Sequence, residues 1–167
     1  MMEFWNKRFF AAPALAAAVL LFAASAAQSQ SAAPEPLSAF PQSLLAVRTV
    51  AGKVVNFKIW EADTPQREEQ GLMFIRELDE HDGMLFMFPG NQPVIMWMKN
   101  TYVSLDLLFL NAQGKIDYIA ANATPLSEKR IGPSTPEFAV LELKGGACEK
   151  FGIKIGDTVL HKHFKKS

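Results

Sequence analysis

Two neighbouring stretches of the chain, residues 44–50 and 54–61, favour β-strands, and polar and apolar residues alternate in the second. In the second stretch the apolar positions are Val55, Phe57 and Ile59, and Asn56 and Lys58 lie between them. Period-two alternation is typical of a strand with one buried face, and the intervening Ala51-Gly52 favours a turn. We therefore predict a β-hairpin over these two stretches.

A short helix is predicted directly after the hairpin. Thr64 is a residue type that accepts backbone N–H groups at a helix N-cap, and Pro65 suits the first helical position because its missing N–H has no partner there. The helix should end near Gly71, and the apolar residues 72–74 that follow would anchor it to the core.

Short apolar runs separated by turn residues follow: residues 84–88, 94–99, 105–110, 116–122 and 138–143. Residues 147–151 are predicted to form one helical turn, and residues 158–161 a last strand. Many short strands at close spacing are typical of a sandwich or small barrel. The expected fold is mostly β, a single compact antiparallel β-sandwich or barrel-like domain with one or two short helices.

The N-terminus has the order of a secretory signal. Lys7 and Arg8 precede an apolar run over residues 9–24, and small residues follow at positions 24–26. We expect a signal peptide over residues 1–26 with cleavage near Ala26, a flexible linker over 27–43 and a domain over 44–167. An uncleaved anchor is the alternative. The expected location is periplasmic or secreted, without a membrane span after cleavage.

Charge argues against some partners. Residues 1–26 contain Glu3, Lys7 and Arg8, so 15 of the 17 basic and 16 of the 17 acidic side chains remain after cleavage. A net charge near minus one does not suggest a nucleic acid or an anionic membrane as partner. Five lysines gather near the end, and a solvated tail accounts for them. They are Lys150, Lys154, Lys162, Lys165 and Lys166.

Four stretches carry a family resemblance. They are Arg67 with residues 71–74, residues 83–86, residues 97–101 with Leu105 and Asp106, and residues 141–143 with Gly146, Gly156 and Asp157. In this order they resemble the family called domain of unknown function 192. The resemblance covers nearly all of the expected domain and implies a compact β-rich fold, often secreted, without an assigned activity, substrate or cofactor.

Two carboxylates are the weak catalytic candidates. Asp106 interrupts an apolar strand, so it needs a partner or a cleft, and Arg67, Lys99 and Asn100 are the nearest partners by residue type. With Glu142 it could form the acid and base of a glycan-acting hydrolase. Alternatively, Asp106 pairs with a cation or caps the turn Thr101-Tyr102-Val103, and Glu142 points outward from its strand.

The expected ligand-binding residues are Arg67, Trp97, Lys99, Asn100 and Asp106. Trp97 and Lys99 alternate with Met96 and Met98, so one strand face would present a ring beside a cation. Such a face can hold a sugar or a small anion. It could equally be a Trp covering the core beside a solvated Lys.

Neither a metal nor a cofactor is expected. Five methionines from Met73 to Met98 suggest a copper(I) site, because thioethers bind this ion. The spacing argues against such a site, since Met84 and Met87 would face opposite sides of one strand. His81, or His161 with His163, lacks a closed ligand set. Cys148, the only cysteine, is interpreted as a buried and inert thiol.

These observations favour a non-enzymatic exported binding or accessory module with a small-molecule or glycan ligand. A hydrolase using Asp106 and Glu142 is one alternative, and a protein interaction module with an exposed apolar patch near Trp97 is another. The sequence makes no prediction of the oligomeric state.

Overall fold

The computed structural model describes residues 33–90 and 92–164. The expected signal peptide and the first part of the expected linker lie outside these ranges. A short 3-10 helix, η1 (Leu37–Ala39), precedes the first strand, and Phe40 is already buried. The folded domain therefore includes residues before position 44. Within the described ranges, no helix has the length and apolar content needed to cross a membrane.

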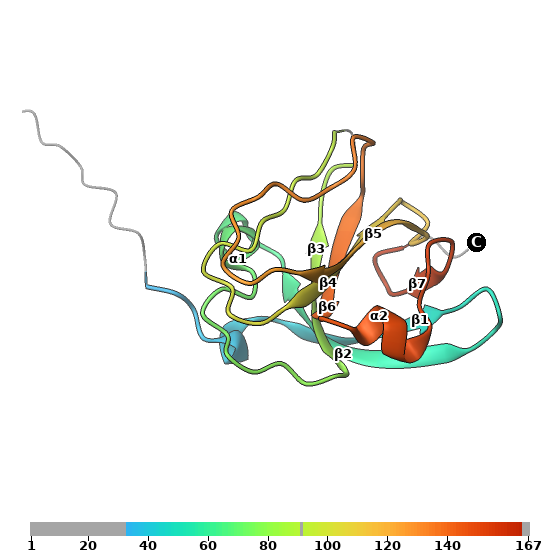
Figure 1. The fold of residues 1–167 in the computed structure, drawn as a ribbon, viewed down its shortest axis with the longest axis horizontal. Coiled ribbons are helices and arrows are strands. Elements are labelled where there is room, and N and C mark those ends of the chain that lie inside the picture. The colour runs from blue at the N-terminus through green and yellow to red at the C-terminus, as the bar shows by residue number, and fades with distance from the viewer. Residues whose placement is uncertain (1–32, 91, 165–167) are drawn as a thin grey trace, which may run out of the picture. The chain divides into compact units, whose positions relative to one another are not determined.

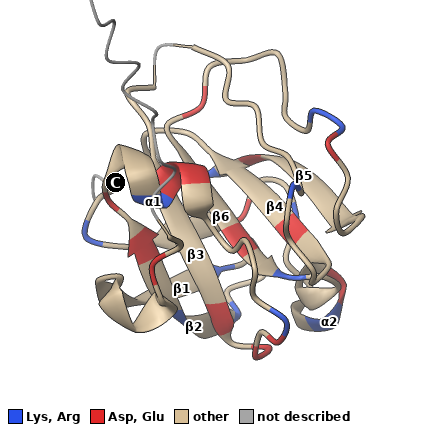
Figure 2. Ribbon diagram, turned by 90° about the vertical axis from the view of Figure 1, so that its left-hand side faces the viewer, with Lys and Arg blue, Asp and Glu red and all other residues tan. Residues whose placement is uncertain are grey.

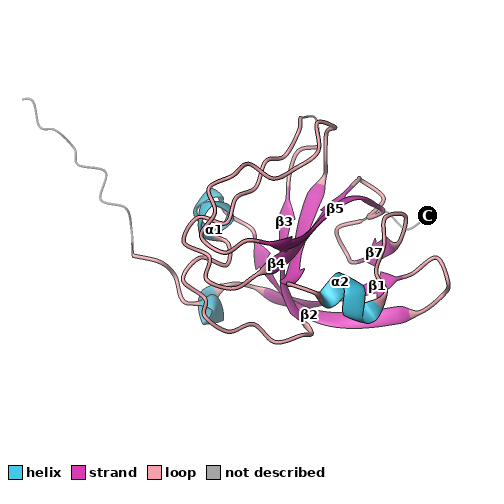
Figure 3. Ribbon diagram, in the orientation of Figure 1, coloured by secondary structure: helices cyan, strands magenta, loops and turns pink. Residues whose placement is uncertain are grey.

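Seven strands form one sheet, and two short helices accompany it (Figures 1 and 3). The strands are β1 (Gln42–Arg48), β2 (Val54–Ala62), β3 (Asp82–Met87), β4 (Leu105–Leu110), β5 (Ile116–Ala123), β6 (Ala139–Lys144) and β7 (Thr158–Leu160), and the helices are α1 (Pro65–Gln70) and α2 (Ala147–Phe151). The strand order is β5-β4-β6-β3-β2-β1-β7, and the sheet curls into a half-barrel. The prediction of a mostly β domain with short helices is confirmed.

One strand pair departs from the antiparallel expectation. β2 and β3 are parallel, whereas the other pairs in the sheet are antiparallel. Parallel neighbours need a crossover connection, and the segment that contains α1 supplies it. The predicted cap of α1 is confirmed: Thr64 Oγ1 accepts a hydrogen bond from Arg67 N–H at 3.3 Å.

The apolar run at residues 94–99 forms a loop instead of the predicted strand. Val94 and Met98 are buried while Ile95 and Trp97 are exposed, so the buried positions are four residues apart. Met96 forms an isolated bridge with Ile131 in another loop. The run is apolar because it covers the core, which local alternation does not distinguish from strand pairing.

Both faces of the sheet are buried. One face packs against α2 and includes Leu108, Leu141 and Cys148, and the other includes Met84, Leu107 and Met98 beneath long loops. Burial on both sides explains why β4 is apolar at nearly every position. It also places Asp106 of β4 and Glu142 of β6 inside the protein, where each needs a partner.

Candidate functional site

Three loops meet at one end of the molecule: residues 71–78 after α1, 92–104 before β4 and 124–131 after β5. Main-chain hydrogen bonds join them. Phe74 N–H donates to Asn100 O at 2.8 Å, Leu126 N–H donates to Thr101 O at 3.0 Å, and Met98 N–H donates to Ser127 O at 2.9 Å. The middle loop is therefore fixed on both sides by its neighbours.

Three residues of these loops have left-handed backbones. The φ angles are 66° at Phe74, 56° at Asn100 and 62° at Leu126. Asn tolerates this region, but a bulky side chain there is unusual and costs on the order of 1–3 kcal/mol. Such strain persists only where the surrounding contacts determine the conformation, so the backbones of these loops are held in place.

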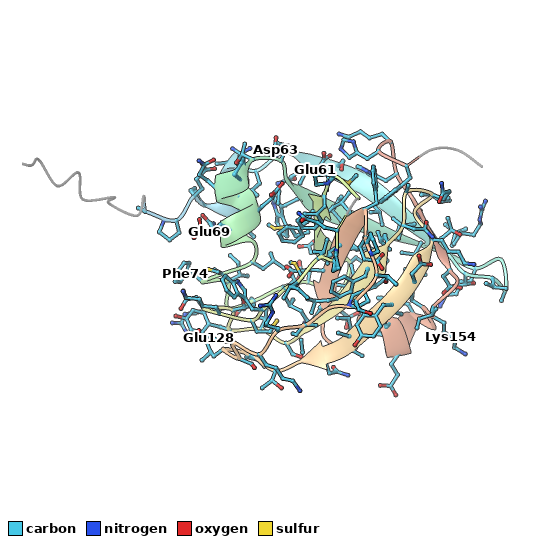
Figure 4. All side chains as sticks on the ribbon, turned by 90° about the horizontal axis from the view of Figure 1, so that it is seen from above. Glu61, Asp63, Glu69, Phe74, Glu128 and Lys154 are labelled. Carbon is cyan, nitrogen blue, oxygen red and sulfur yellow. The ribbon has the colours of Figure 1, made fainter. Side chains whose placement is uncertain are left out.

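The loops present large apolar side chains to solvent. Trp97 is 48% exposed, Leu126 is 56% exposed and Phe74 and Tyr102 are also exposed. In the view of Figure 4, Phe74 and Glu128, which belongs to the same loop as Leu126, lie on the same side of the domain. We call the surface formed by these four side chains, Phe74, Trp97, Tyr102 and Leu126, the aromatic face. A cluster of exposed apolar side chains rimmed by polar residues is typical of an interaction site.

Each ring of the aromatic face that carries a polar atom has a cation beside it. Lys99 Nζ lies 5.6 Å from the centroid of the Trp97 ring, and Arg76 Cζ lies 4.5 Å from that of Tyr102. Lys129 and Arg130 are exposed on the third loop. The juxtaposition of Trp97 and Lys99 was predicted, although on a strand, whereas Arg76 and Tyr102 were not identified.

Arg67 lies outside the aromatic face. Its guanidinium donates to Glu35 at 3.0 Å, to Asp63 at 2.7 Å and to the carbonyl of Ala39 at 2.9 Å. It also lies over the ring of Phe40. These carboxylates raise the pKa of Arg67. Arg67 thus ties the segment before β1 to α1.

Asn100 provides the left-handed turn of the middle loop, with its amide 3.9 Å from Met73 Sδ.

Asp106 is sealed in the interior. Its carboxylate accepts hydrogen bonds from the N–H groups of Asn122 at 2.8 Å, Gly146 at 3.1 Å and Cys148 at 2.8 Å. No part of the residue is exposed. Neither Arg67, Lys99 nor Asn100 donates to it among the described contacts. Asp106 therefore fixes the start of α2. The expected partners, a cation or the turn at residues 101–103, are not among its donors.

Glu142 lies on the opposite face of the sheet from Asp106. Asp106 is in register with Leu143 and Leu107 with Glu142, and facing residues of paired strands share a face. Burial raises the pKa of Glu142 to about 8. Two buried carboxyl groups separated by the sheet cannot flank one glycosidic bond, so the geometry does not support the expected hydrolase pair. Glu142 also does not point outward.

A charged cluster that sequence analysis missed joins the chain end to the sheet. His163 Nε2 lies 2.8 Å from Glu61 Oε2, Lys162 Nζ lies 2.7 Å from Glu61 Oε1, and Ser43 Oγ lies 2.9 Å from His161 Nε2. Glu61 follows Val55, Phe57 and Ile59 in the buried alternation of β2, and this pattern was the signal that could have identified it.

The other candidates occupy structural positions. Within residues 33–90 and 92–164, no group of three or more His, Cys, Asp or Glu side chains could hold a metal ion. Met84 and Met87 do lie on opposite faces. His81 Nδ1 lies 2.8 Å from Asn56 O, and its ring packs 4.8 Å from that of Phe151. Burial and the nearby Asp106 raise the pKa of the Cys148 thiol.

Comparison with known proteins gives a family but no activity. The profile of the DUF192 family, described as an uncharacterised group, matches residues 46–161. No curated protein matches. A crystal structure from Sinorhizobium meliloti 1021, of a protein proposed to be a transcription regulator, is similar with 38% identity and a TM-score of 0.71, covering 72% of this chain and 94% of that one. A protein of unknown function from Novosphingobium aromaticivorans DSM 12444 is similar with 34% identity and a TM-score of 0.71, covering 77% and 91%.

Proposed function

Because this chain belongs to the DUF192 family, whose members are uncharacterised, we propose from its own geometry that it is a non-catalytic binding module. The observation that carries the proposal is the aromatic face: exposed rings with adjacent cations, on loops whose backbones are held in an uncommon conformation. Loops whose backbones are fixed before binding lose little conformational entropy when a ligand arrives. The face is thus suited to binding.

The ligand that we propose is an acidic glycan. Flat rings of Trp97 and Tyr102 offer apolar surface with a polar atom at one edge, which suits the mixed surface of a sugar. Lys99 and Arg76 beside the rings can donate to carboxylates or phosphates of such a glycan. The signal peptide expected at the N-terminus would bring the domain to the glycans of the cell envelope.

The test is a binding measurement with paired variants. Trp97→Ala with Tyr102→Ala should weaken binding of uronic-acid oligosaccharides or peptidoglycan fragments by about tenfold or more, measured by calorimetry. Tyr118→Ala is the matched control, because Tyr118 is 37% exposed and Tyr102 is 38% exposed, and Tyr118 lies on β5. Absence of binding to every acidic glycan, or equal weakening by Tyr118→Ala, would argue against the proposal.

A protein partner is the second candidate for the same face. Leu126 and Ile95, which lies two positions before Trp97, are exposed aliphatic side chains, which a protein interface would bury. A photo-crosslinking residue at position 97 should then join the domain to one specific protein in cells. Leu126→Asp should abolish that product. Under the glycan proposal, neither the original chain nor the Leu126→Asp variant should give a crosslinked product with one specific protein.

The role proposed for the Sinorhizobium protein does not extend readily to this chain. Regulators that contact DNA usually carry a basic face. Here basic and acidic positions are interspersed over the domain (Figure 2). We therefore retain the binding module without a nucleic-acid partner as the proposal.

A further inference from the structure

A second surface lies away from the aromatic face. Figure 4 shows Phe74 and Lys154 at opposite ends of the domain. Near Lys154, the turn between β1 and β2 and the end of α2 enclose an open groove with a volume of about 620 Å³. Residues 49–51 and Lys53 line one wall, and residues 149–152 and Lys154 line the other, with Asp157 between them.

A buried carboxylate holds the two walls together. Asp157 is 3% exposed, and it accepts hydrogen bonds from Val50 N–H at 2.8 Å and from Lys154 N–H at 2.7 Å. Because its two oxygens are engaged by the two walls, Asp157 keeps the groove at a fixed width. The charge at the mouth of the groove is then set by the side chains around it.

Three lysines line the groove. Lys53 Nζ donates to Phe151 O at 2.7 Å, which holds this ammonium at the wall with further N–H groups available. Lys150 pairs with Glu80, and both side chains are more than half exposed, so the pair is weak. Lys154 has no ion-pair partner in the described part of the chain. Against these cations, Glu149 is the acidic lining residue besides Asp157.

Apolar side chains project beside these lysines. Val50, at the turn, is 83% exposed, and Ile155, next to Lys154, is 60% exposed. A free anion would contact only the lysines and would leave this apolar surface in water. A lipid surface can bind the lysines through its phosphate groups and the aliphatic side chains through its acyl chains at the same time.

We propose that this groove docks the domain on a membrane surface containing anionic phospholipids. The lipid phosphate lies between Lys53 and Lys154, and Val50 and Ile155 enter the interfacial layer. Lys150 and Lys154 are thus part of a folded site, whereas their position in the sequence predicted a solvated tail. The net charge had argued against an anionic membrane as partner. This inference does not depend on the proposed glycan ligand.

The test is co-sedimentation of the protein with vesicles. Binding is expected to an equimolar mixture of phosphatidylcholine and phosphatidylglycerol, and not to phosphatidylcholine alone. Each lysine near an anionic surface contributes about fivefold, so Lys53→Gln with Lys154→Gln should reduce binding by about 25-fold. Lys129→Gln, on the exposed loop of the aromatic face, is the control and should leave binding unchanged.

A second variant separates a membrane from a free anion. Val50→Ser changes an exposed turn position, so the fold is retained, and it should reduce vesicle binding without altering any binding of inorganic phosphate. If phosphate at constant ionic strength displaces the protein and Val50→Ser has no effect, the groove takes a free anion and membrane docking is overturned. Equal vesicle binding by the lysine variant and by Lys129→Gln would also overturn it.

Discussion

Two glutamates of the sheet are both buried but differ in the charge that the fold favours. Burial alone would raise the pKa of Glu61, but hydrogen bonds from Lys162, His163 and Ser43 lower it to about 2. Glu142 has a buried oxygen without a hydrogen-bond partner among the described residues, and burial raises its pKa to about 8. Residue type and burial therefore do not determine ionisation, which depends on the partners that surround each carboxyl group.

Glu142 should make the protein less stable as the pH rises. The carboxyl group has a pKa near 4.5 when unfolded and about 8 when folded, so unfolding releases a proton between these values and stability falls. We expect a loss of about 3 kcal/mol between pH 5 and pH 8, measured by urea unfolding. Glu142→Gln should remove most of this slope. An unchanged slope in that variant would show that another group titrates.

At the scale of one element, α2 depends on a residue of a distant strand. A helix of five residues is too short to be stable alone. Its N-cap, Gly146, has no side chain to accept the first N–H groups. The carboxylate of Asp106 accepts from Gly146 and Cys148 instead, and from Asn122 at the end of β5. Asp106 thereby joins β4, β5 and α2.

Asp106→Ala should therefore loosen α2 and destabilise the domain. Three backbone N–H groups lose their acceptor, which we expect to cost about 3–5 kcal/mol in urea unfolding. Hydrogen exchange of the amides at 147–151 should accelerate more than that of β3. Asp117→Ala is the control, because Asp117 is exposed on the same sheet, and it should cost less than about 0.5 kcal/mol. Equal losses in both variants would contradict this role.

At the scale of the whole molecule, the cluster around Glu61 closes the domain. Ser43 lies near the start of the sheet, Glu61 at the end of β2, and His161 and His163 after the last strand. Residues about 100 positions apart meet there, so the cluster attaches the segment after β7 to β1 and β2. Hydrogen bonding and charge pairing are both lost if Glu61 becomes protonated.

Acid should consequently release this attachment. The pKa of Glu61 is lowered from 4.5 to about 2, so its contribution is complete above pH 4.5 and is lost as the pH falls toward 2. Glu61→Gln should cost about 2 kcal/mol at pH 6 and should flatten the acid side of the stability curve. Exposed Glu69 provides the control Glu69→Gln. A wild-type acid slope in Glu61→Gln would contradict the assignment.

The hydrophobic pattern of the sequence was sufficient to predict most individual elements. The predicted runs at 105–110 and 147–151 coincide with β4 and α2, and Thr64-Pro65 does begin α1. Alternation, capping and turn residues act within a few positions of one another, so the sequence displays them directly. The matched motifs likewise indicated the family, which the DUF192 profile shows.

Other properties depended on contacts between distant segments, and only the tertiary structure decided them. These include the parallel pairing of β2 with β3, the loop at 94–99 and the partners of Asp106. A carboxylate within an apolar strand predicts that hydrogen-bond donors surround it, but the neighbouring sequence does not identify those donors. Likewise, Trp97 and Lys99 are two positions apart in sequence, whereas Arg76 and Tyr102 meet because folding brings two loops together. Local geometry is therefore encoded locally, and the surfaces proposed for binding are products of the fold.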